Sequence, residues 1–272
     1  MLTGDDFGLT VPVNEAVEEA HLRGILSTAS LMVGAKAARD AVLRARRLAD
    51  LRVGLHLVLT RGRPVLPPSE IPALVGREGR FRDGLGRAGF RYFVLPSARR
   101  QLEKEIRAQF NAFRATGLPL DHVNVHNHMQ LHPTVLGLIL AVLRERGIAP
   151  VRLPREPFLP SWRAAGGRFP QRLLSRLFLV PWTGLVRLRL SRMNVPCNDC
   201  LFGMHDTGRM GKDLLLRLLP RLPPGVSELH FHLAAGEPDW ELEALTSGEV
   251  ADAMRRYGIE RIRFGDLGGR ER

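Results

Sequence analysis

Short apolar runs alternate with longer amphipathic stretches along this chain, and the alternation restricts the fold more than any other feature. Such a pattern predicts strands that alternate with helices, which is typical of a parallel sheet with helices packed outside it. The expected strands are residues 1–3, 28–33, 52–59, 122–126, 150–153, 200–203, 228–233 and 261–264. The expected helices are residues 13–23, 35–49, 98–116, 134–146, 171–179, 212–219 and 248–257.

The number of repeating units indicates the architecture. Seven or eight strand–helix units in a chain of 272 residues approach the size of a (β/α) barrel. We therefore predict an α/β fold, a variant (β/α) barrel of seven to eight strands, formed as a single domain over residues 1–272. An open doubly wound sheet is the alternative, although no Walker loop favours a nucleotide site. Residues 61–93 are rich in Gly, Pro and Arg, and are expected to form a long loop insertion over one face.

The charge balance narrows the choice of partners. The chain has 40 Lys and Arg against 28 Asp and Glu, a formal net charge of +12. Such a balance suits nucleic acid, an anionic membrane or an acidic ligand. Only 6% of the residues are aromatic, so a base-stacking platform, and with it nucleic acid, is not expected. An anionic surface, or simply a solvated arginine-rich surface, fits better.

Cysteine usage and the absence of a recognisable leader favour the cytoplasm. The sequence has neither an apolar run long enough to cross a bilayer nor a basic stretch followed by an apolar one. Cys197 and Cys200 are too few for a disulfide framework, and no second pair completes a structural zinc site, so we expect an inert pair. The first residues resemble the end of a strand, and we expect that this strand begins before Met1.

Asp and His residues gather where four of the expected strands end. They occur in "GDDFG" with Asp5 and Asp6, in "VGLHLVL" with His56, in "DHVNVHNHMQLHP" and in "ELHFHLA". Because the strands of a (β/α) barrel end on one rim, these side chains should meet there. A carboxylate with two imidazoles makes a cation site that keeps open coordination positions, which is the catalytic pattern.

Each of these segments also has a purely structural interpretation. A histidine in an apolar strand, such as His56, is more often a hydrogen-bonded core residue than a ligand. His126 and His128 share a strand face by the two-residue period, a spacing that often occurs without a metal. Asp5 and Asp6 alone are compatible with a turn and a helix cap. The combination of the four segments in one chain is what favours a common site.

In this order, "GDDFGLT", "RVGLHLVL", "DHVNVHNHMQLHP" and "HFHLA" resemble the YdjC-like carbohydrate deacetylases. The segments "NEAVEEAHLRGILSTASLMV", "IRAQFNAFRATGLPLDHVN" and "RIRFGDL" are similar to the hopanoid biosynthesis-associated HpnK branch of that family. The resemblance covers nearly the whole chain and is weakest over residues 154–198. It implies a NodB/YdjC-like variant barrel that hydrolyses the N-acetyl group of an amino sugar.

The resemblance also implies roles for individual residues. Asp6, His56 and His126 match the family's metal ligands, for one divalent ion that is Zn²⁺, Mg²⁺, Mn²⁺ or Co²⁺. Asp5 matches the general base and His232 the general acid. We expect His128 and Asn124, beside these positions, to bind the substrate.

Some residues depart from the family pattern. Gly4 stands where Ala is common, Asn124 and Val125 stand where many relatives have Asp-Ser, and Gln130 stands where a further histidine is frequent. These departures leave the three expected ligands untouched and suit a substrate unlike simple chitobiose. The hopanoid branch implies N-acetylglucosaminyl bacteriohopanetetrol or a close relative.

Residues 171–192 add a separate indication about location. This stretch is strongly apolar, carries Arg at both ends and has Trp182 in its middle, a composition typical of interfacial segments. Peripheral contact with the inner face of an anionic membrane is one interpretation, and an outer barrel helix with solvated arginines is the other. The sequence leaves open whether the chain forms a homodimer.

Two rival functions remain at this stage. The first is another hydrolase on the same scaffold, such as a phosphoesterase or a deacetylase of soluble chitooligosaccharides. The second is a protein without enzymatic activity that binds hopanoids, a membrane or nucleic acid.

Overall fold

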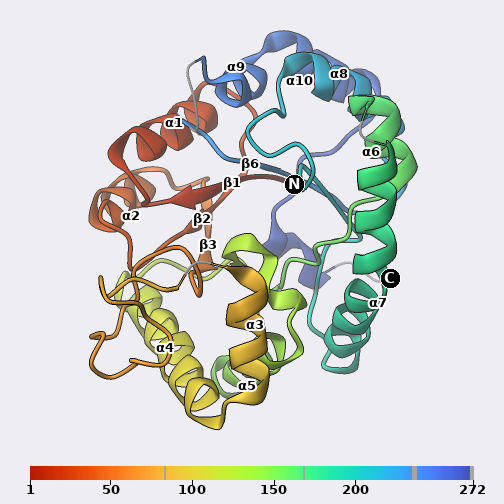
Figure 1. The fold of residues 1–272 in the computed structure, drawn as a ribbon. Coiled ribbons are helices and arrows are strands. Elements are labelled where there is room, and N and C mark those ends of the chain that lie inside the picture. The colour runs from red at the N-terminus through yellow and green to blue at the C-terminus, as the bar shows by residue number, and fades with distance from the viewer. Residues whose placement is uncertain (83, 168, 235–237, 270–272) are drawn as a thin grey trace.

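A curled, wholly parallel sheet forms the centre of the computed structural model, which describes residues 1–82, 84–167, 169–234 and 238–269. The strand order is β4-β3-β2-β1-β6-β5, and every neighbouring pair is parallel. Figure 1 shows the helices arranged around these strands, as expected for an α/β fold. The strands are β1 (Leu2–Phe7), β2 (Thr28–Leu31), β3 (Arg52–Leu57), β4 (Val123–Val125), β5 (Cys200–Phe202) and β6 (Ser227–Phe231).

Two of the described helices, α1 and α9, begin at a residue whose side chain caps the helix. Thr10 accepts a hydrogen bond from the Val13 amide at the start of α1, and Asp239 does the same for Leu242 in α9. The helices are α1 (Val11–Leu22), α2 (Ala38–Arg47), α3 (Leu85–Val94), α4 (Pro96–Ala115), α5 (Pro133–Arg146), α6 (Phe158–Ala165), α7 (Phe169–Arg192), α8 (Lys212–Leu218), α9 (Trp240–Thr246) and α10 (Gly248–Arg256). Three 3₁₀ segments are η1 (His126–Leu131), η2 (Leu219–Arg221) and η3 (Phe264–Gly269).

The prediction of seven to eight strands is not confirmed, because the sheet has six strands in the described residues. Residues 150–153 do approach β4, where the Val123 amide donates to Pro150 O and the Arg152 amide donates to Val123 O. They form only an isolated bridge between Val151 and Val123. Pro150 and Pro154 lack the N–H group that a continuous ladder requires, so this stretch fills the gap beside β4 as irregular chain.

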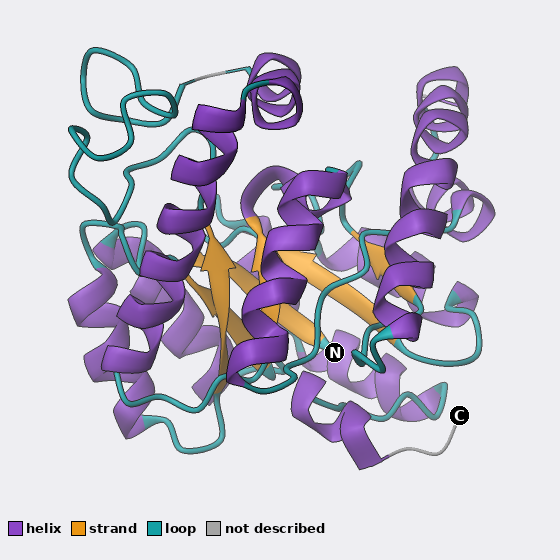
Figure 2. Ribbon diagram, turned by 90° about the horizontal axis from the view of Figure 1, so that it is seen from below, coloured by secondary structure: helices purple, strands orange, loops and turns teal. Residues whose placement is uncertain are grey.

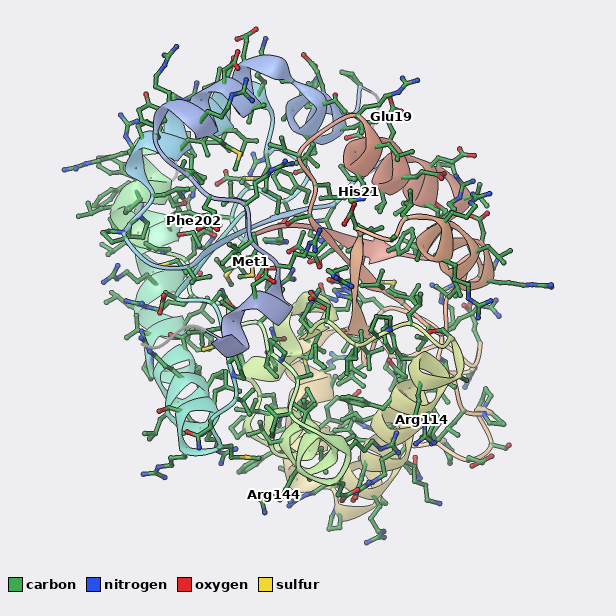
Figure 3. The ribbon with its side chains drawn as sticks, turned by 180° about the vertical axis from the view of Figure 1, so that it is seen from behind. Met1, Glu19, His21, Arg114, Arg144 and Phe202 are labelled. Atoms are coloured by element: carbon green, nitrogen blue, oxygen red, sulfur yellow. The ribbon has the colours of Figure 1, made fainter. Side chains whose placement is uncertain are left out.

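The other missing strand lies near the C-terminus. Residues 261–263 are irregular, and Phe264 begins η3 instead of ending a strand. Phe264 packs with Met1, Ile262 and Leu267 in a small separate cluster, and its ring stacks on His122 at 4.3 Å between centroids. Figure 3, viewed from behind, shows Met1 near the middle of the molecule, next to the ribbon of η3.

In the segment expected as a long loop, 61–93, the described residues up to Gly84 form no helix, and helix α3 follows. Two amides of the irregular part, those of Val65 and Leu66, donate to the buried carboxylate of Glu105 in α4. Tyr92 of α3 donates its hydroxyl hydrogen to Leu59 O. These contacts fix the insertion to the body of the protein.

One large apolar cluster connects the sheet with the surrounding helices, from Leu2 to Met254. Strands such as β3 are buried along nearly their whole length because helices cover their outer side chains. Figure 2, seen from below, shows the strands enclosed by helices on both sides. None of the described helices combines the length and the apolar character required to cross a bilayer.

Candidate metal centre

Asp5 and Asp6 can serve one site because β1 is irregular where they lie. In a regular strand, consecutive side chains point to opposite faces. Here the pairing register shifts between Gly4 and Phe7, and Asp6 adopts a left-handed backbone with φ of 60°. Such bulges re-aim side chains, and strained backbone of this kind concentrates at functional sites. Both carboxylates therefore reach the same rim.

Asp6, His56 and His126 converge, as expected from the sequence. Asp6 Oδ1 lies 3.2 Å from His56 Nε2 and 3.2 Å from His126 Nδ1, and the two ring nitrogens are 3.3 Å apart. Asp6 lies near the end of β1, His56 near the end of β3, and His126 directly after β4, at the start of η1; β2 lies between β1 and β3 in the sheet. Their ligand atoms all lie within 4.8 Å of one another.

The hydrogen bonds of Asn124 determine which nitrogen of His56 faces Asp6. The Asn124 amide nitrogen donates to Asp5 Oδ1 at 3.0 Å and to Ser30 Oγ at 2.8 Å. Its carbonyl oxygen is therefore left to accept from His56 Nδ1, 2.8 Å away. With Nδ1 protonated, neutral His56 directs the lone pair of Nε2 at Asp6. This orientation by a neighbouring polar group is the usual arrangement around a metal-binding imidazole.

The donor set fits a divalent cation. Asp6 Oδ1 is buried and accepts no hydrogen bond, although two ring nitrogens lie close to it. One carboxylate oxygen and two imidazole nitrogens that face each other at such distances repel unless a positive charge lies among them. A carboxylate with two imidazoles suits Zn²⁺, Mn²⁺ or Co²⁺, and Mg²⁺ less well.

Electrostatics in this group favour an ionised Asp6 next to a positive charge. Burial opposes ionisation of Asp6, but the contacts with His126 and His56 hold the pKa of this carboxyl far below its usual range. Burial also disfavours the charged form of His56, yet the contact with Asp6 and the negative charge of Asp5 raise the His56 pKa. A proton on His56 and a bound cation would therefore compete for the same negative site.

Asp5 lies deeper and is held by Arg152, a residue that the sequence analysis did not single out. Arg152 has no exposed surface and donates to both oxygens of Asp5, at 2.6 and 2.9 Å. The same guanidinium also contacts Glu228 at 2.6 Å. Burial opposes ionisation, but the Arg152 charge holds the pKa of Asp5 well below its usual range. The only sequence signal was one arginine between apolar residues in an expected strand.

His230 and His232 form a second group with Asp5, and their ligand atoms lie within 4.8 Å of one another. His230 Nδ1 is 3.3 Å from Asp5 Oδ2, and the His230 and His232 rings meet edge to face at 5.2 Å. His128 packs against His230 in the same manner at 5.5 Å. Burial lowers the pKa of His230 and, more strongly, that of His128, so both are neutral near pH 7.

The residues expected to bind substrate differ in accessibility. Asn124 has no exposed surface, and both atoms of its amide are used within the protein. His128 is only partly buried, has a left-handed backbone with φ of 54°, and its Nδ1 makes no hydrogen bond. His232 is also only partly buried as a residue, and its backbone N–H donates to Glu241 at 2.6 Å.

A buried chain of hydrogen bonds continues beneath the site. Ser30 Oγ lies 2.9 Å from His122 Nε2, and His122 Nδ1 lies 2.9 Å from Asp121 Oδ2. Burial opposes ionisation of Asp121, but His122 lowers the pKa of this carboxyl. This series of hydrogen bonds ends at Asn124, so it supports the side-chain amide that orients His56.

One cavity reaches a proposed ligand, and a second cavity is lined by other segments. One of about 280 Å³ is lined by His126 together with Leu9, Thr10 and Met32. Another of about 370 Å³ lies between α6 and α7, beside residues 154–158 and His205. Neither Asp5 nor any of the three proposed ligands is among the described residues that line this second cavity.

Comparison with known families agrees with this geometry. The family profile described as "YdjC-like protein" matches residues 1–256. The chain belongs to the YdjC-like family.

Several relatives of this YdjC-like protein bear the name carbohydrate deacetylase. The one from Brevibacillus brevis (strain 47 / JCM 6285 / NBRC 100599) is 38% identical over 154 residues, or 57% of this chain and 58% of the relative. Those from Geobacillus stearothermophilus and Vibrio vulnificus (strain CMCP6) are 35% and 39% identical, over 59% and 53% of this chain. The matches span 63% and 54% of those two relatives, so each covers less than two thirds of the relative's length.

A solved structure shares the fold of this YdjC-like protein along nearly its whole length. It is a candidate cellobiose-phosphate cleavage protein from Enterococcus faecalis V583, with a TM-score of 0.72 over 98% of this chain and 97% of that one. The sequence identity is 22%, so the likeness supports the fold alone.

Proposed function

We propose that this YdjC-like protein is a metal-dependent carbohydrate N-deacetylase that hydrolyses the N-acetyl group of an amino sugar. The observation that carries the proposal is the convergence of Asp6, His56 and His126 within 4.8 Å. The carbohydrate deacetylases to which the chain is similar support the same reaction class.

Asp6, His56 and His126 would hold the cation, which when bound polarises a carbonyl oxygen and lowers the pKa of water. Asp5 is the proposed general base, because its carboxyl group stays ionised and it directly precedes the proposed ligand Asp6 in the chain. Arg152 holds this carboxylate in one orientation through two hydrogen bonds. The same arginine makes Asp5 a weak base, so its position matters more than its proton affinity.

His232 is the proposed general acid that donates a proton to the departing sugar amine. The residue is only partly buried, and Glu241 accepts a hydrogen bond from its backbone N–H. His128, with an uncommitted ring nitrogen in the same cluster, is the proposed substrate contact. For Asn124 we propose a positioning role, because its amide already binds Asp5 and His56.

For the substrate we propose N-acetylglucosaminyl bacteriohopanetetrol or a close relative, acted on at the cytoplasmic face of an anionic membrane. The motif resemblance to the hopanoid branch supports this choice.

The test is incubation with the acetylated glucosaminyl hopanoid and, separately, with N-acetylated chitobiose, followed by mass spectrometry for the loss of an acetyl group. We expect deacetylation of the hopanoid, with Asp6→Asn inactive and Asp213→Asn, a change to an exposed carboxylate on α8, fully active. Activity on chitobiose but not on the hopanoid would rule out the proposed hopanoid substrate. Full activity of Asp6→Asn would contradict the proposed site.

A further inference from the structure

Helix α7 exposes an apolar stripe to solvent, which is the reverse of an ordinary surface helix. Leu174, Leu177, Phe178 and Trp182 follow the spacing of one helix face, and Leu177 and Phe178 are 64% and 70% exposed. The opposite face of α7 is the buried one, with Thr183, Val186 and Leu190 toward the protein.

Helix α3 repeats this feature on a smaller scale. Phe90 and Phe93 are 68% and 70% exposed, and Val94 beside them is also exposed. The side of α3 that packs on the protein consists of Ala88, Gly89 and Tyr92. The two phenylalanines are therefore mostly exposed, although Phe93 also contacts His132.

Exposed apolar side chains are concentrated in these two regions. Of the twenty large hydrophobic residues exposed in the described chain, five lie within 85–95 and eight within 159–188. Scattered exposed apolar residues are normal, but a concentration of this kind marks a binding surface.

The charges on the two helices have a single sign. Helix α7 contains five arginines and no Asp or Glu, and α3 contains two arginines and no Asp or Glu. Arg176, Arg187 and Arg192 are exposed on α7, as is Arg87 on α3. Arg187 also contacts Asp199, outside the helix, at 3.5 Å. Leu, Phe and Trp together with arginines, on helices without an acidic residue, match an anionic lipid interface.

Both helices contact the chain just after η1, the segment that carries His126 and His128. In α3, the Phe93 ring meets His132, just after η1, at 6.3 Å. In α7, Arg189 donates to Pro133 O at 2.9 Å, at the start of α5. Figure 1 shows the two helices as separate elements, α3 at the lower centre and α7 at the right.

We propose that α3 and α7 form a surface by which the protein binds an anionic lipid bilayer. The charges decide between this occupant and a second copy of the chain, because two copies meeting through these faces would bring arginines against arginines. Lipid phosphates instead neutralise them, while Leu177, Phe178, Phe90 and Phe93 enter the interface between headgroups and acyl chains.

The test measures binding of the full chain to vesicles by flotation, with no turnover involved, so a failed deacetylase assay leaves it unaffected. We expect binding to phosphatidylcholine vesicles that contain phosphatidylglycerol, weakened by salt, and little binding to phosphatidylcholine alone. The pairs Leu177→Gln/Phe178→Gln and Phe90→Gln/Phe93→Gln should each weaken binding by about tenfold or more.

A matched control pair is Leu22→Gln/Leu43→Gln, at two exposed leucines of α1 and α2, which should bind vesicles like the wild type. The proposal fails if the wild type does not bind anionic vesicles at low salt, or binds both vesicle types equally. It also fails if the α3 and α7 variants bind as well as the control. A homodimer that dissociates in the same variants would assign the surface to a second copy.

Discussion

At the scale of single residues, Arg152 has the largest predicted effect. Its guanidinium neutralises two buried carboxylates, Asp5 and Glu228, and all three side chains are almost wholly buried. Arg152→Met would leave two negative charges in the interior without a partner. We expect the free energy of unfolding, measured with urea, to fall by about 3–5 kcal/mol.

Arg152→Lys keeps the positive charge but loses the planar fork that contacts both carboxylates, so its stability should lie between those of the wild type and Arg152→Met. An unchanged urea midpoint in Arg152→Met would show that the buried ion pairs contribute little to the fold.

Asn124 allows a separate residue-scale prediction about metal affinity. The amide fixes the ring of His56 through its carbonyl oxygen and contacts no other proposed ligand. Asn124→Ala should therefore weaken binding of Zn²⁺ by about 10–100-fold in a calorimetric titration. Gln109→Ala removes another buried amide, which binds the backbone of Val58, and should lower stability but leave metal affinity unchanged. Equal affinity in Asn124→Ala and the wild type would contradict the positioning role.

At the scale of elements, β3 accommodates the His122 ring only because residue 54 is glycine. A Cβ atom at Gly54 would lie 2.4 Å from atoms of that ring, and the ring is held between Ser30 and Asp121. We expect Gly54→Ala to destabilise the protein by about 1–3 kcal/mol, measured by thermal unfolding. Gly184→Ala in α7 meets nothing within 4 Å and should instead stabilise slightly. If Gly54→Ala left the thermal stability unchanged, β3 would have to shift freely to make room for the added methyl group.

Sequence patterns predicted the elements best where periodicity was strong. All six sheet strands, and the helices around the sheet from α1 to α5 except α3, lie where the pattern placed them within a few residues. The failures have local causes. Pro150 and Pro154 interrupt a stretch that looked like a strand, and α7 continues through Pro181 well beyond the expected end at residue 179. Helix α3 was hidden because it exposes its apolar residues, so its pattern did not resemble a core-facing helix.

The candidate site was predictable to the extent that it lay in short motifs. Asp6, His56 and His126 stood out as polar residues at strand ends, and they do converge. Arg152 and Ser30 were not foreseen, because a lone arginine or serine in an apolar stretch carries no pattern. Their partners are distant in the chain, and only the closure of the sheet brings them together.

At the scale of the whole molecule, a buried charged cluster attaches α6 and α7 to the loop after β5. Arg172 of α7 donates to both oxygens of Asp206, and to Ser161 of α6. Glu156 accepts from Ser161 and from the His205 amide. Burial raises the Glu156 pKa to about 7, assisted by the negative charge of Asp206. The attachment therefore includes one group that titrates near neutral pH.

This titration predicts a pH-dependent stability difference between the wild type and Glu156→Gln. Between about pH 4.5 and 7 the folded wild type keeps a proton on Glu156 that the unfolded chain has lost, so the contribution of Glu156 to stability falls as the pH rises. Glutamine cannot ionise and is exempt from this loss. The free energy of unfolding of Glu156→Gln minus that of the wild type should therefore increase by about 1–3 kcal/mol across this window and stay constant above it. Urea unfolding at pH 5, 6, 7 and 8 measures the difference, and a flat profile would show that Glu156 is already ionised in the folded protein at pH 5.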